Sequence, residues 1–129
     1  MLSSVYLRKA NYAKVIETVN EFLNRHNDRT YEDLLRSNLA VAYSRNGELE
    51  KSDQELRRLD EIAKHNTETA YRLAVAYTDL GRNDEAISLL QKCFAARDDR
   101  LMWIKVEPRL DPLRGDPRFQ DILRQMRLL

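Results

Sequence analysis

Apolar residues recur at helical spacing along most of the chain, and one apolar stretch is repeated. The sequence LAVAY stands at 39–43 and again at 73–77, 34 residues further on. Apolar residues at i, i+3, i+4 and i+7 lie on one face of a helix, and both copies belong to such a face. Its members are Leu35, Leu39, Ala42 and Tyr43 around the first copy and Ala70, Leu73, Ala74 and Tyr77 around the second. No stretch shows the sustained alternation of a strand, so the pattern predicts an all-α fold.

A glycine and a second helical pattern follow each repeated stretch. Gly47 and Gly81 come four positions after their tyrosines and favour the left-handed conformation in which helices often end. The apolar stripes that follow are Leu49, Leu56, Leu59 and Ile62 in the first case and Ala86, Leu89, Leu90, Cys93 and Phe94 in the second. Because a short loop makes consecutive helices antiparallel neighbours, we predict two helical hairpins with a 34-residue period.

A helical hairpin of this length, with these core residues, resembles the tetratricopeptide repeat. The residues that carry the resemblance in the later unit, from Thr67, are Leu73, Ala74, Tyr77, Gly81 and Ala86. Those of the earlier unit, from Asp33, are Leu39, Ala40, Tyr43, Gly47, Ser52, Leu56 and Leu59. Arg36 and Ala70 depart from the pattern, because tryptophan is common at this position. The resemblance implies a right-handed superhelix of antiparallel helical hairpins.

The same numbering divides the chain into repeats within a single domain 1–129. It gives a partial first repeat at 1–27, full repeats at 33–64 and 67–98, and a capping tail at 99–129. Tyr6 fits the tyrosine position of the first repeat, whose first helix begins part-way along. We expect an excised piece of a longer array, with a short natural start as the alternative.

Prolines and aspartates organise the tail. Asp111 before Pro112 and Asp116 before Pro117 each predict an N-cap followed by the first helical residue. The apolar stripe of the last helix, suited to cover the end of a solenoid, consists of Phe119, Ile122, Leu123 and Met126. We expect Trp103 to pack on the last repeat as part of this cap; the alternative is an exposed anchor for a partner.

The tail also resembles segments that follow tetratricopeptide-repeat arrays in bacterial signalling proteins. The string that carries this resemblance is KVEPRLDPLRGDPRFQDILRQMRL. Those proteins include serine/threonine kinases, adenylate cyclases and transcription regulators. The resemblance implies a regulatory or scaffolding portion of such a protein.

Composition and charge narrow the classes of partner. The formal net charge is +1, so nothing indicates the positive field that usually attracts nucleic acids or membrane surfaces. No apolar run is long enough to span a membrane. The lone Cys93 fits a reducing compartment, and we expect a cytoplasmic protein.

Residues with catalytic potential are better explained by structural roles. His26 and His65 lie near helix ends, where cations are favoured, and Cys93 falls on a core face. Acidic pairs at Asp98-Asp99 and Glu48/Glu50 suit helix starts and loops. No phosphate-cradling or metal motif is present, so we expect no enzyme activity, no cofactor and no metal.

The resemblance implies that the first helix of each repeat lines a concave groove. The residues predicted to contact a partner there are Asn38, Val41, Arg45, Tyr71, Arg72, Val75 and Asp79. An extended peptide or a helix is the expected ligand, with Arg45 and Arg72 available to pair carboxylates. The alternative is a structural self-association module, in which a homodimer forms.

Overall fold

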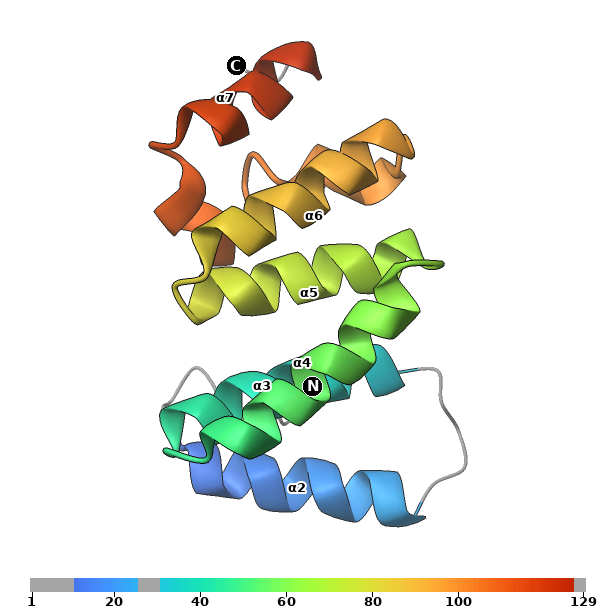
Figure 1. Cartoon of the computed structure of the whole chain (residues 1–129), viewed down its shortest axis with the longest axis vertical. Coiled ribbons are helices and arrows are strands. Elements are labelled where there is room, and N and C mark those ends of the chain that lie inside the picture. Colours follow the sequence, from blue (N-terminus) through green and yellow to red (C-terminus); the bar gives the residue numbers. More distant parts are fainter. Residues whose placement is uncertain (1–10, 26–30, 127–129) are drawn as a thin grey trace. The chain divides into compact units, whose positions relative to one another are not determined.

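The structure, a computed structural model, describes residues 11–25 and 31–126 (Figure 1). Its α-helices are α2 (Tyr12–Arg25), α3 (Glu32–Arg45), α4 (Leu49–Ala63), α5 (Thr67–Asp79), α6 (Asn83–Ala95) and α7 (Pro117–Gln125). Two 3-10 helices, η1 (Asp99–Trp103) and η2 (Pro108–Leu113), lie between α6 and α7. These two ranges contain no strand, which confirms the all-α prediction. No helix in them is both long enough and apolar enough to cross a membrane.

The chain divides into two compact units, Met1–Glu61 and Ile62–Leu129. The division falls near the end of α4.

The first unit has a small core in which α2 packs against α3. The buried residues of this core are Val15, Val19, Leu35, Leu39, Ala42 and Tyr43. Asn20 on α2 donates a hydrogen bond to the Tyr43 hydroxyl at 3.2 Å, which satisfies the polar end of this aromatic residue. The first LAVAY stretch is therefore mainly a packing surface.

Polar contacts join α3 to α4. The Ser52 hydroxyl donates to the Ala40 carbonyl at 2.7 Å in a buried position. Arg36 binds Glu32 on its own helix at 2.8 Å and Glu55 on α4 at 3.0 Å. Burial lowers the pKa of the Arg36 guanidinium, but the hydrogen bonds to the two carboxylates outweigh burial and raise it. Arg36 occupies the position at which the repeat commonly carries tryptophan, and its ion pair with Glu55 joins α3 to α4 there.

In the second unit, α5 and α6 form an antiparallel hairpin (Figure 1). Gly81 between them has a φ of +76°, and the Arg82 N–H returns to the Tyr77 carbonyl at 2.8 Å. Asn66 caps the start of α5 by accepting from the backbone of Glu68 at 2.9 Å. The predicted glycine turn is confirmed. The buried residues of this hairpin include Leu73, Ala74, Ala76, Ala86, Ile87, Leu90 and Cys93.

The tail covers this hairpin with short helices. Leu110 and Leu113 of η2 and Phe119 of α7 are fully buried. Asp116 caps α7 by accepting from the Arg118 N–H at 2.9 Å, with Pro117 as the first helical residue, as predicted. The predicted cap at Asp111 is wrong. Glu107 caps η2 instead, and Asp111 lies inside that helix.

Trp103 also differs from its prediction as a packed residue. Its side chain is 61% exposed, at the end of η1. The apolar residue that η1 buries is Leu101. In a helix this short, the neighbouring Trp103 falls on a different face.

Candidate protein-binding surface

The seven residues predicted to contact a partner differ in their accessibility. Three are buried, namely Asn38, Val41 and Val75. Arg45 is exposed, and the partly exposed residues are Tyr71, Arg72 and Asp79. The three buried residues pack within the protein in this structure, and their contact with a partner stays a prediction. The accessible members of the set are therefore the charged residues and Tyr71.

Arg45 lies at the end of α3 beside α2. Its guanidinium donates to the Tyr12 hydroxyl at 3.3 Å and stands 5.9 Å from the centre of the Tyr12 ring. The ring and hydroxyl of Tyr12 orient the guanidinium, while the Arg45 side chain stays exposed. Arg45 is thus a positioned surface cation.

Arg72 forms an ion pair with Glu68 one turn earlier on α5, at 3.0 Å. The exposed fractions of these side chains are 27% for Arg72 and 39% for Glu68. Pairs at this spacing add only a few tenths of a kcal/mol to a helix, so a stronger carboxylate ligand can replace Glu68 at low cost. The pair presents a cation and an anion side by side.

Asp79, at the end of α5, is engaged by the tail. Arg109 of η2 binds its carboxylate through Nε at 2.9 Å and through Nη2 as well. Both side chains are mostly shielded, which makes the pair stronger than an ordinary surface ion pair. Any partner that uses Asp79 must compete with this internal arginine.

Tyr71 lies on the α5 side that faces the same tail segment. Burial raises the pKa of its phenol to about 12, with a further increase from the carboxylate of Glu107; Arg109 and Arg72 act in the opposite direction. Tyr71 and Asp79 therefore mark a face of α5 that is covered by residues 107–113. Sequence reasoning missed this cover because Glu107 and Arg109 belong to no periodic pattern.

The residues considered for chemistry have structural surroundings. Cys93 is buried, and its thiol donates to the Thr67 carbonyl at 3.6 Å. His65 lies exposed in the turn after α4, and His26 falls outside the described residues. Asp98 accepts from the Thr67 hydroxyl. In residues 11–25 and 31–126, no three His, Cys, Asp or Glu side chains gather in a group that could hold a metal ion.

Hydrogen bonds to Asn46 and Lys51 lower the pKa of the Glu48 carboxyl. Glu48 therefore acts as a local partner in the turn that connects α3 to α4.

Antiparallel hairpins that recur at a fixed interval define a helical-repeat protein. Residues 67–100 match the family model of the tetratricopeptide repeat. The chain therefore contains a tetratricopeptide repeat, and its all-α fold is of that type. Members of this family are generally non-catalytic protein-interaction modules. Comparison with curated proteins and with solved structures finds no significant match.

Proposed function

We propose that the chain is a protein-interaction module that binds a peptide or protein partner through the first helices of its hairpins. The observation that carries this proposal is the tetratricopeptide repeat at residues 67–100. The α5/α6 hairpin in this segment has the tight glycine turn and small core residues that such a repeat needs.

The accessible charges of α3 and α5 indicate the chemistry of the partner. Arg45 is exposed, and Arg72 shares a partly exposed pair with Glu68. Guanidinium groups bind carboxylates through paired hydrogen bonds, so the proposed partner presents acidic side chains or a terminal carboxylate. Asp79 and Tyr71 contribute less, because the tail already occupies their side of α5.

The cellular setting belongs to the same proposal. The tail sequence from Lys105 to Leu128 supports a regulatory or scaffolding portion of a bacterial signalling protein. The lone Cys93 supports a cytoplasmic location.

Selection from a random peptide library tests the proposal while the natural partner is unidentified. The protein is immobilised, displayed peptides are selected on it, and their dissociation constants are measured by fluorescence anisotropy. The combined change Arg45→Glu and Arg72→Glu should weaken binding of the selected peptides by about tenfold or more. The melting temperature should fall little, because a Glu–Glu pair at i, i+4 costs only a few tenths of a kcal/mol.

Arg57→Glu is the matched control, since Arg57 is an exposed arginine on α4. It changes net charge by the same amount per site and should leave the dissociation constant within about twofold. A selection that enriches no peptide, or peptides whose affinity ignores the reversals at 45 and 72, would contradict the proposed function.

A further inference from the structure

Arg109 of η2 is held against α5 by one edge of its guanidinium. Its Nε donates to the Asp79 carboxylate at 2.9 Å, and its Nη2 donates to the same carboxylate oxygen. The Glu107 side chain accepts from the Arg109 backbone N–H at 3.1 Å, so the main chain is held as well. The ion pair uses two of the guanidinium donors and leaves the others for further contacts.

The opposite edge of this guanidinium, which carries Nη1, reaches the surface. Within residues 11–25 and 31–126, Nη1 of Arg109 makes no hydrogen bond, and it is not among the buried side-chain atoms that lack a partner. The Arg109 side chain is 29% exposed, about as accessible as that of Arg72 at 27%. Arg109 thus presents N–H donors to solvent from a fixed position.

Arg36 shows, in the same protein, how one arginine binds two carboxylates. Its Nε donates to Glu32 at 2.8 Å, and its Nη1 donates to Glu55 at 3.0 Å. The planar guanidinium permits this arrangement because its donors point outward in a fixed fork. Arg109 already has the first of two such carboxylates in Asp79. The second place can be taken by a carboxylate of another molecule.

Asp79 brings Arg109 to the face of α5 that carries Arg72. Arg72, Val75 and Asp79 stand at i, i+3 and i+7, which places them on one face of the helix. Seven residues of an α-helix rise roughly 10 Å. Burial raises the pKa of the Tyr71 phenol, and both Arg72 and Arg109 act against this increase, so both cations lie near Tyr71. The same face of α5 therefore presents two arginines in a row.

We propose that Arg109 is a further partner-binding residue, whose Nη1 binds a carboxylate of the partner while Asp79 holds the opposite edge. This inference rests on the proposed function and adds a residue of the tail to the first helices. Together with Arg72, Arg109 selects partners that carry two acidic side chains roughly 10 Å apart. In an extended peptide, which rises about 3.3 Å per residue, this distance separates acidic residues by about three positions.

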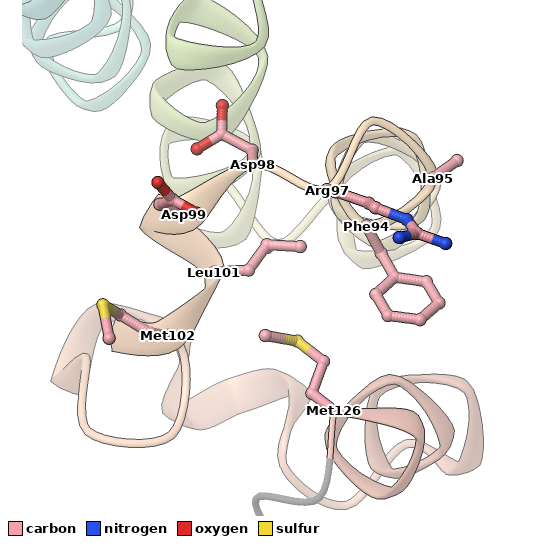
Figure 2. Close-up of a pocket in the computed structure, with 8 residues that line it drawn as sticks. All are labelled: Phe94, Ala95, Arg97, Asp98, Asp99, Leu101, Met102 and Met126. Atoms are coloured by element: carbon pink, nitrogen blue, oxygen red, sulfur yellow. The ribbon is translucent and has the colours of Figure 1, made fainter.

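A cavity elsewhere in the second unit supplies an arginine for comparison. The cavity has a volume of about 780 Å³ and lies between the ends of α6 and α7 and η1 (Figure 2). The described residues that line it include the exposed Arg97 and none from α5 or η2. Arg97→Gln removes the same charge as Arg109→Gln from a different surface and should leave the affinity for acidic peptides within about twofold.

Fluorescence anisotropy with acidic peptides selected on the wild-type protein tests the inference. Arg109→Gln should raise their dissociation constants by about three- to tenfold. Replacing the contacted acidic residue of the peptide by its amide should weaken binding to the wild type. The same replacement should have no further effect on Arg109→Gln, because both changes remove one contact. A purely structural role of Arg109 would not couple the two changes.

Asp79→Asn separates binding by Arg109 from attachment of the tail. It breaks the same ion pair as Arg109→Gln, but it keeps the arginine and removes an anion beside it. Acidic peptides should therefore bind Asp79→Asn more tightly than the wild type, while they bind Arg109→Gln more weakly. Urea unfolding measures how much stability each variant loses.

Two results would overturn the inference and leave the proposed function standing, if reversal at Arg45 and Arg72 still weakens binding. Arg109→Gln could bind the peptides as the wild type does, with the loss at Arg97→Gln instead, which would assign the carboxylate to the cavity. Alternatively, Arg109→Gln and Asp79→Asn could weaken binding equally, which would limit Arg109 to attaching the tail. Selected peptides without acidic residues, or peptides whose affinity ignores the reversals, would contradict the proposed function as well.

Discussion

At the scale of single residues, some positions matter for their backbone conformation and others for the contacts of their side chains. Gly47 and Gly81 have φ values of +83° and +76°, and a Cβ placed on either meets no atom within 4 Å. Their requirement is therefore conformational. Arg36 shows the opposite case, because it acts through the hydrogen bonds that its side chain donates to Glu32 and Glu55.

Gly81→Ala should destabilise the protein by about 1–2 kcal/mol, the cost of placing a side chain in the left-handed conformation. Gly115→Ala is the matched control, since Gly115 has equal space and no left-handed φ. It should be neutral or stabilising by up to about 1 kcal/mol. Urea unfolding measures both, and equal effects at the two positions would contradict the turn assignment.

The pH at which the Tyr71 phenol ionises should show whether the tail covers α5. Its pKa is about 12 in the folded protein, above the ordinary value of 10.0, so the folded state holds the proton more tightly. The stability linked to Tyr71 is complete below pH 10 and is lost as pH rises through 12. Tyrosinate absorbance compared between wild type and Tyr71→Phe isolates this titration.

A titration of Tyr71 near pH 10 would show that residues 107–113 do not cover α5. Arg109→Gln serves as a companion variant. It removes a cation that favours tyrosinate, so the Tyr71 pKa should rise further while the tail remains in place.

At the scale of elements, the hairpins could be predicted and the tail only in part. The repeated LAVAY and the glycine after each copy fix helix faces and turns through local periodicity, which the sequence displays directly. In the tail, Asp111-Pro112 and Asp116-Pro117 look alike, yet only the second starts a helix. The chain already turns helical at Pro108, because Leu110 and Leu113, three residues apart, share a face of a 3-10 helix that packs on α5.

The two aspartates should therefore differ on replacement. Asp116→Ala removes the α7 cap and should lower the free energy of unfolding. Asp111→Ala removes a surface pair with Arg114 and should cost less than about 1 kcal/mol. Chemical denaturation measures the free energies of unfolding, and a larger loss at Asp111 than at Asp116 would contradict the helix starts described above.

The accessibility of the candidate binding residues was less predictable than the helices. Repeat position placed Asn38, Val41 and Val75 in the groove, where contact with a partner stays a prediction, and the structure buries all three. Burial depends on which segments pack against a helix, and periodicity within that helix carries no such information. The packing prediction for Trp103 was wrong, since a lone aromatic residue has no periodic partners that reveal its face.

At the scale of the whole molecule, the proposed binding elements are divided between the two units. We propose that the first helices α3 and α5 bind a partner. The units Met1–Glu61 and Ile62–Leu129 each contain one of the first helices, so each can be examined for partner contact by itself.

Hydrogen–deuterium exchange with a library-selected peptide shows directly whether the first helices bind a partner. Exchange rates report local opening segment by segment, so they reveal where a bound peptide stabilises the chain. We expect slower exchange in α3 and α5 on peptide binding, and loss of this protection in the Arg45→Glu, Arg72→Glu variant. Protection confined to α4, α6 or η1, with α3 and α5 unchanged, would contradict binding by the first helices.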